Sequence, residues 1–280
     1  MADDDLVEID DVFGKDGGSE NYRILEKIGS GKYGLVYKVQ SNVDNMKYAM
    51  KMINLDSDPD AASNEIAILS TVTGEKRVVQ MKESFDSEIY EGNYKLIVLE
   101  LMYTDLEAQL DGGRILCKEN TVKIGYEVIG MLQVMNKFGI YHKDLHAGNL
   151  MFTKQFEAMK IADFGLSVFA RQNRRMDDKY DYKYDIVMLV HLLMNIRTPY
   201  KMTTYPERGR MANHREITDV KATLYENDSL FLRRFVNEVL DQLKGDLNYR
   251  KLSEAMRSSY FSFDPSQPFV LNDAVPPQLE

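Results

Sequence analysis

Two aspartates and an asparagine near the middle of the chain have spacings that suit metal-dependent chemistry on a phosphate compound. Asp144 and Asn149 lie in the segment Tyr141-His142-Lys143-Asp144-Leu145-His146-Ala147-Gly148-Asn149, which apolar residues follow. An aspartate held in a loop can orient a hydroxyl and accept its proton, and an asparagine five residues later can ligate magnesium. Fourteen residues after Asn149 comes Asp163-Phe164-Gly165, directly after a short apolar run. An aspartate at that place can hold magnesium that bridges nucleotide phosphates.

A glycine-rich segment stands much earlier in the chain, at Gly29-Ser30-Gly31-Lys32-Tyr33-Gly34-Leu35-Val36. Glycines let backbone N–H groups approach phosphates because no Cβ stands in the way. Glycine is also common in ordinary tight turns, so this spacing alone leaves both interpretations open. A dinucleotide-binding fold would continue as a helix, whereas this sequence continues as an apolar strand.

A lysine lies inside an apolar strand pattern, Tyr48-Ala49-Met50-Lys51-Met52-Ile53, 17 residues after Gly34. A buried ammonium group is unfavourable unless it is paired. Glu65, in a predicted helix, is a candidate partner, and together the two could aim Lys51 at phosphates. The alternative is a lysine on the solvent face of its strand.

The elements that must position these residues change in character along the chain. Short β-rich runs predict strands over residues 22–28, 35–40, 46–53 and 94–99, and a helix is predicted over 61–71. Beyond Asp105 the pattern becomes helical: Ile124, Val128, Met131, Leu132 and Met135 share one face. The run Ile186–Met194 is apolar on all sides and predicts a buried helix, and further helices are predicted over 229–244 and 249–258. The fold class is therefore α+β.

Four regions are predicted: an acidic leader at 1–20, a small β-rich lobe at 21–102, a larger helical lobe at 103–262 and an extended tail at 263–280. The leader holds eight acidic residues against Lys15, most of the chain's net charge of −9. We expect it to be disordered, because acidic segments poor in aromatic residues bury too little apolar surface. A docking element for a basic partner is the alternative. Prolines predict the extended tail.

Composition excludes several classes of protein. The longest apolar run has nine residues, whereas a membrane-spanning helix needs about 20. The single cysteine, Cys117, cannot form an internal disulfide, which favours a reducing compartment. We therefore expect a soluble cytoplasmic or nuclear protein with no membrane partner. The sequence contains no basic cluster of the kind that would indicate a nucleic-acid-binding surface.

In this order, the motifs resemble the signature of the eukaryotic protein kinases, over residues 22 to about 260. The resemblance implies a bilobal protein-kinase-like fold that binds ATP and Mg²⁺ and acts on a protein substrate. It implies that Lys51 and Glu65 anchor phosphates, that Asp144 is the catalytic aspartate and that Asn149 and Asp163 are the metal ligands. The residues that it implies around ATP are Ile28, Gly29, Gly31, Gly34, Val36, Ala49, Lys51, Leu99, Glu100, Met102, Asp105 and Met151.

The resemblance also implies supporting roles elsewhere. Asp185 is similar to the aspartate that braces the catalytic loop, and Leu69, His142 and Phe164 are similar to a stacked spine of side chains. The segment Asp246–Leu252 is similar to that of casein kinase relatives, so a divergent member of that group is one interpretation.

Two departures from the kinase pattern keep three functions open. His146, assigned to the catalytic set, stands where Ser/Thr kinases usually carry a lysine that touches the transferred phosphate. Only 19 residues separate Gly165 from Asp185, with no Ala-Pro-Glu motif, so the activation segment is shortened. The first hypothesis is a Ser/Thr protein kinase. The alternatives are a pseudokinase that binds nucleotide as a scaffold for a partner, and a small-molecule kinase, whose motifs the segment Asp144–Asn149 also resembles.

Overall fold

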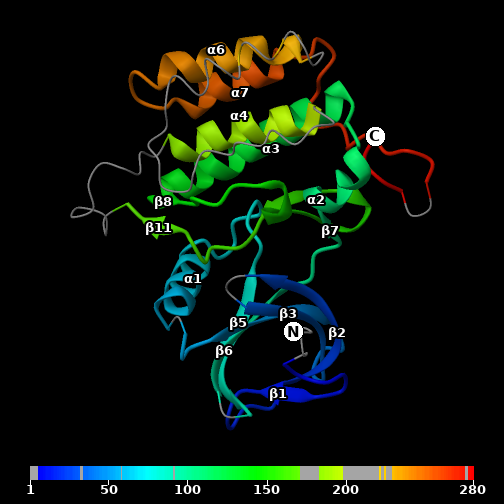
Figure 1. Ribbon diagram of the computed structural model, residues 1–280, viewed down its shortest axis with the longest axis vertical. Coiled ribbons are helices and arrows are strands. Elements are labelled where there is room, and N and C mark those ends of the chain that lie inside the picture. The colour runs from blue at the N-terminus through cyan, green and yellow to red at the C-terminus, as the bar shows by residue number, and fades with distance from the viewer. Residues whose placement is uncertain are drawn as a thin grey trace. The chain divides into compact units, whose positions relative to one another are not determined.

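The computed structural model divides the chain into two compact units (Figure 1). The first unit is Met1–Met102 with Asp163–Ser167, and the second is Tyr103–Ala162 with Val168–Glu280. The structure describes residues 6–31, 34–57, 59–90, 92–170, 183–197, 221, 224, 229–274 and 277–280. The first unit is rich in strands and the second is mainly helical, which confirms the α+β class.

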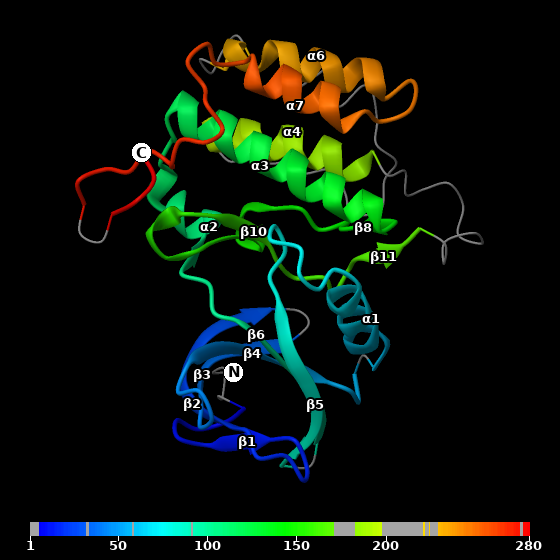
Figure 2. The ribbon, with the colours of Figure 1, turned by 180° about the vertical axis from the view of Figure 1, so that it is seen from behind.

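The first unit is built on a six-stranded antiparallel sheet with the order β1-β2-β3-β4-β6-β5. Figure 2 shows β4, β6 and β5 following one another across the sheet. The strands are β1 (Val12–Gly14), β2 (Asn21–Gly31), β3 (Gly34–Ser41), β4 (Lys47–Asn54), β5 (Met81–Ile89) and β6 (Gly92–Glu100). The four strands predicted from the sequence are all present. The sequence analysis did not predict β5. Its sequence has many charged residues, so the alternation of apolar and polar side chains expected of a strand is weak.

One helix, α1 (Pro59–Thr71), completes the first unit and agrees with the helix predicted over 61–71. Its buried positions include Ala62, Ile68 and Leu69, together with the charged Glu65. Spacings of three and four residues place these side chains on one side of the helix. The Glu65 side chain is therefore buried within the first unit.

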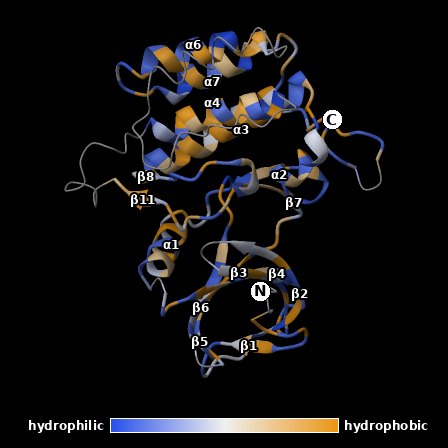
Figure 3. Cartoon of the chain, viewed as in Figure 1, coloured by the Kyte–Doolittle hydropathy of each residue, from blue (hydrophilic) through white to orange (hydrophobic). Residues whose placement is uncertain are grey.

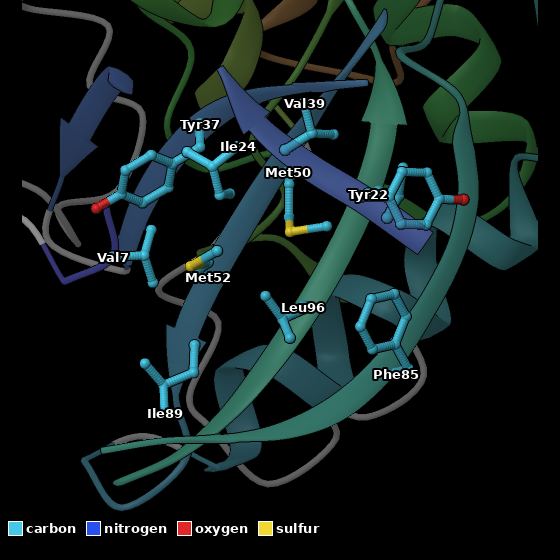
Figure 4. Packing of buried hydrophobic residues seen from close by; sticks show 11 residues of the cluster. Val7, Tyr22, Ile24, Tyr37, Val39, Met50, Met52, Phe85, Ile89 and Leu96 are labelled. Atoms are coloured by element: carbon cyan, nitrogen blue, oxygen red, sulfur yellow. The ribbon is translucent and has the colours of Figure 1, made fainter. Parts of the chain in front are cut away.

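The leader is the main correction to the expected organisation. Residues 6–20 are ordered: β1 pairs with β2, and Val7 is only 3% exposed. Figure 4 shows Val7 within the same apolar cluster as Tyr37 and Met52. Asp3, Asp4 and Asp5 lie outside the described residues, and the other acidic side chains of the leader are exposed or partly exposed. Leu6, Val7 and Phe13 supply the apolar contacts. Net charge misled the prediction because a few apolar residues and one open strand edge are enough to fix a short segment.

The second unit is organised around two long helices, α3 (Lys118–Lys137) and α4 (Tyr184–Arg197). Every residue from Ile186 to Met194 is buried, which confirms the helix predicted to be buried on all sides. In Figure 3, α4 carries mostly hydrophobic colour, whereas α6 (Arg233–Gln242) and α7 (Tyr249–Arg257) alternate between the two colours. The apolar face predicted for α3, from Ile124 to Met135, is buried as well.

Short strands and turns frame the loops of this unit. A three-stranded sheet has the order β10-β9-β7, from β7 (Thr104–Asp105), β9 (Leu150–Phe152) and β10 (Met159–Ile161). A second pair joins β8 (Ile140–Tyr141) to β11 (Val168–Phe169). The four-residue helix α2 (Leu106–Gln109) follows β7. Because β8 and β9 flank residues 142–149, they fix both ends of that loop.

The described part of the tail contains turns and one isolated β-bridge, and it is well anchored. Phe269 and Leu279 are buried, and Leu271 bridges back to Leu279. Asn120 of α3 donates to the carbonyls of Val270 and Glu280, both at 2.8 Å, and accepts from the Val270 amide at 2.9 Å. The described part of the chain holds no helix with the length and hydrophobicity needed to cross a membrane.

Candidate active site

The glycine-rich segment joins β2 to β3 in the first unit. Gly29 and Gly31 end β2 and Gly34 begins β3, while Lys32 and Tyr33 lie outside the described residues. Gly34 has φ +139°, and a Cβ there would lie 2.1 Å from the Met52 carbonyl oxygen. This position therefore requires glycine. A Cβ at Gly31 would meet no heavy atom within 4 Å, so packing does not require glycine there.

Lys51 is buried and paired, as predicted. It lies on β4, where it is 7% exposed, and its Nζ lies 2.7 Å from Glu65 Oε2 and 2.8 Å from Asp163 Oδ1. Burial by itself would lower the pKa of Lys51, but the two carboxylates outweigh that effect and raise it. Lys51 is therefore an ammonium ion at neutral pH. Burial raises the pKa of the Glu65 carboxyl, and the Lys51 ammonium opposes that rise.

Asp163 belongs to a short segment that α1 holds in place. Its backbone is left-handed, with φ +61°, and Gly165 donates its amide to Asp163 Oδ1 at 3.3 Å. The Phe164 side chain is fully buried, and Asn64 of α1 donates to the Ser167 carbonyl at 2.6 Å. The sequence analysis did not predict a role for Asn64. Its position next to Glu65 in the predicted helix was the feature that could have indicated one. The first unit thus brings together Lys51, Glu65 and Asp163.

The catalytic-loop candidates lie in the second unit, braced by Asp185. This aspartate accepts hydrogen bonds from the amides of His142, at 2.8 Å, and Lys143, at 2.9 Å. Burial raises the pKa of the Asp185 carboxyl, while these hydrogen bonds and His142 oppose that rise. Lys143 has φ +66°, a strained conformation for a residue other than glycine. The brace therefore fixes the backbone immediately before Asp144.

The loop from Asp144 to Asn149 is closed by its own hydrogen bonds. The Asn149 side-chain amide donates to the Asp144 carbonyl at 2.9 Å, and the Asn149 backbone amide donates to the His146 carbonyl at 3.1 Å. Because the Asn149 amide nitrogen is engaged, its Oδ1 is the atom suited to a metal ion. His146 Nε2 lies 3.7 Å from Asp144 Oδ2. The three predicted residues of this segment are thus neighbours.

The residues implied around adenine and ribose fall in both units. Ala49 pairs with Leu99 across β4 and β6, and Val36 pairs with Lys51 across β3 and β4. Ile28 is 46% exposed on β2. Glu100 accepts from the Gln80 amide at 2.8 Å, and Met102 follows two residues later.

In the second unit Asp105 pairs with Met151 across β7 and β9. Asp105 also has a structural task, because it accepts from the Ala108 amide at 2.8 Å as the N-cap of α2. The nucleotide contacts of all these residues stay predictions.

Comparison with known proteins identifies the family. A family model described as "Protein kinase domain" matches residues 22–185, which is more than half of the chain. This chain belongs to the protein kinase family. It is 30% identical over 156 residues to cyclin-dependent kinase 1 of Encephalitozoon cuniculi (strain GB-M1), across 53% of this chain and 51% of that protein.

Two further relatives are similar at comparable levels. Cyclin-dependent kinase B2-1 of Oryza sativa subsp. japonica is 32% identical over 165 residues, covering 54% of this chain and 51% of its own length. Calcium-dependent protein kinase 22 of Arabidopsis thaliana is 24% identical over 179 residues, covering 60% and 35% respectively. The similarity thus spans about half the length, or less, of these relatives. The likeness to casein kinases stays a prediction.

Proposed function

We propose that this chain is an ATP-dependent protein kinase that transfers the γ-phosphoryl group of ATP to serine or threonine hydroxyls. The observation that carries the proposal is the pairing of Lys51 with both Glu65 and Asp163 inside the first unit. Lys51 and Glu65 are buried, and burying charged groups in an apolar core is unfavourable. Phosphates and a metal ion bound beside these charged groups would compensate the unfavourable free energy of burying them. Membership of the protein kinase family supports the same conclusion.

The residues present fit ATP and Mg²⁺ by their chemistry. Asp163 and Asn149 supply oxygen atoms, the ligands that Mg²⁺ prefers, and Mg²⁺ sites of this kind use one or two carboxylates together with phosphates. Lys51 supplies a fixed positive charge for phosphate oxygens. A Cβ at Gly31 would meet no heavy atom within 4 Å, so a phosphate could approach the backbone on that side without a steric obstacle. Bound magnesium would neutralise charge that develops on the phosphates.

The chain's own residues supply the remaining functions. Asp144 would accept a hydrogen bond from the substrate hydroxyl and take its proton, while Asp185 holds the backbone before it. Glu65 would keep Lys51 in one orientation. The residues implied around adenine, among them Ala49, Leu99 and Met102, would hold the base. We propose a reducing compartment, cytoplasmic or nuclear, because Cys117 is the chain's single cysteine.

A transfer assay tests the proposal. Purified protein is incubated with radiolabelled ATP, Mg²⁺ and a mixture of serine-, threonine- and tyrosine-containing peptides. We expect label on serine and threonine, and a loss of about 1,000-fold or more in Asp144→Ala. Asp241→Asn, an exposed carboxylate on α6, serves as the control and should be as active as the wild type. Equal labelling by wild type and Asp144→Ala contradicts the proposal.

The short activation segment favours a second candidate, a pseudokinase that binds nucleotide and serves as a scaffold for a partner. Protein kinases normally bind peptide substrates along this segment, and here residues 171–182 lie outside the described residues. A scaffold would be stabilised by MgATP without transferring phosphate. The small-molecule kinase suggested by Asp144–Asn149 would instead show ATP hydrolysis or transfer only when a metabolite acceptor is added. The same assay, run with and without such acceptors, separates all three.

A further inference from the structure

The two histidines on either side of Asp144 adopt the same local turn. His142 Nδ1 accepts from the Asp144 amide at 3.3 Å, and His146 Nδ1 accepts from the Gly148 amide at 3.1 Å. A backbone N–H can only donate, so Nδ1 of each ring must be unprotonated. A neutral imidazole then carries its proton on Nε2. For His142 that proton points to the Ala162 carbonyl, 3.0 Å away.

We infer that His146 is a positioning residue that acts through both of its ring nitrogens. Its Nδ1 holds the turn that presents Asn149, and its Nε2–H faces the carboxylate of Asp144, 3.7 Å away. Since Asp144 and Asn149 have their roles from the proposed function, this inference rests on it. His146 therefore does not replace the usual lysine as a phosphate-binding cation. It orients the base and the metal ligand instead.

The backbone around His146 supports this role. His146 has extended dihedrals, φ −148° and ψ 173°, and is the N-cap of the short helix Ala147–Asn149. A Cβ added at Gly148 would lie 2.9 Å from Glu107 Oε2 and 3.0 Å from His146 Cε1, so both side chains pack on that backbone. Lysine has three donors and no acceptor. At position 146 it would leave the Gly148 amide without the acceptor that the imidazole provides.

Three substitutions separate the two nitrogens. In His146→Asn the side-chain oxygen can replace Nδ1, whereas nothing replaces Nε2. In His146→Gln the terminal amide can reach the place of Nε2, whereas the Nδ1 acceptor is lost. We expect His146→Asn to lower kcat about 10- to 100-fold with KM for MgATP unchanged, because the metal-ligand turn is kept. We expect His146→Gln to raise KM for MgATP, and His146→Lys to be impaired in both constants.

A lysine variant as fast as the wild type, or an asparagine variant with full kcat, overturns the inference. A second measurement needs no turnover. Nitrogen NMR of protein labelled only at its four histidines reports which ring nitrogen carries the proton, and the signal absent from His146→Gln assigns residue 146.

We expect the tautomer with its proton on Nε2, because Nδ1 accepts from the Gly148 amide. A proton on Nδ1 overturns the inference even in an inactive protein. A wild type that transfers no phosphate but shows the expected tautomer contradicts the proposed function and leaves the geometry of His146 established.

Discussion

At the scale of single residues, the first unit contains a buried lysine that two carboxylates share. Lys51 neutralises Glu65, which is 1% exposed, and also contacts Asp163. Removing one partner of a buried ion pair leaves an uncompensated charge, whereas replacing both by apolar groups is often tolerated. The stability of this group therefore depends on the set of charges rather than on any one contact.

The lysine is tested by a single and a double variant. Lys51→Met should lower the free energy of unfolding by about 3–5 kcal/mol and abolish stabilisation by MgATP. Lys51→Met combined with Glu65→Leu should recover most of the lost stability without recovering MgATP binding. Urea unfolding with and without MgATP measures both effects. Similar stability in the two variants would show that Glu65 is not the charge that Lys51 compensates.

His191 is a second residue with a measurable electrostatic consequence. It is 5% exposed on α4, and neither ring nitrogen has a hydrogen-bond partner among the described residues. Burial lowers the pKa of His191 below its usual value of 6.5. The His191 side chain therefore binds a proton more readily in the unfolded chain than in the folded chain. Titration of His191 does not reduce the free energy of unfolding above pH 6.5, and it reduces this free energy progressively as the pH falls below 6.5.

His191→Leu should therefore make stability less sensitive to acid. As the pH is lowered from about 8 to about 5, we expect the wild type to lose more unfolding free energy than the variant. Each unit of pKa difference between the folded and unfolded states corresponds to about 1.4 kcal/mol. Chemical unfolding across this pH range measures the change. A difference that stays constant with pH would show that His191 is protonated equally in both states.

At the scale of elements, the leader is part of the first unit's sheet. β1 lies at one edge of the sheet, and Asp10 contacts Arg23 of β2 at 3.9 Å. Farther along, Lys82 of β5 binds Glu20 at 2.6 Å and Asp44 at 2.9 Å. The end of the leader is therefore connected to two other parts of the unit by charged hydrogen bonds. Such exposed pairs contribute little each, so apolar burial at Val7 carries most of the anchoring.

Two matched valines test this conclusion. Val7→Ala should lower the free energy of unfolding by about 2 kcal/mol, because a buried side chain loses apolar contacts and leaves a cavity. Val12→Ala makes the same chemical change at a position that is 55% exposed and should change stability by less than about 0.5 kcal/mol. Thermal and urea unfolding measure both. Equal effects would indicate a leader that does not pack.

At the scale of the whole molecule, the candidate site residues divide between the two units. Lys51, Glu65 and Asp163 belong to the first, and Asp144, His146 and Asn149 belong to the second. The chain passes between the units at Met102–Tyr103, Ala162–Asp163 and Ser167–Val168. A ligand that uses residues of both units links their stabilities by mass action.

Thermal stabilisation by MgATP tests whether both units contribute to one ligand site. At a ligand concentration of about 100 times Kd, the wild type should gain about 2.7 kcal/mol. Asp163→Asn, in the first unit, and Asn149→Ala, in the second, should each reduce that gain. Asp241→Asn should keep it. If Asn149→Ala is stabilised as much as the wild type, nucleotide binding depends on the first unit alone.

The sequence alone was enough for features that depend on local pattern. The strands around the glycine-rich segment, the helix that carries Glu65 and the buried helix Tyr184–Arg197 follow from periodicity and turn residues within a few positions. The pairing of Lys51 with Glu65 was also predictable, because a lysine in an apolar strand needs a nearby acid.

Only the tertiary structure decided the contacts between distant residues. Val7 enters a core with Met52, Asp185 binds the backbone of His142, and Asn120 holds Val270 across 150 positions of sequence. It also decided which backbone amide His146 Nδ1 meets, that of Gly148. The physical reason is that local pattern follows from neighbouring residues, whereas a buried polar group is satisfied by whichever partner the folded chain brings to it.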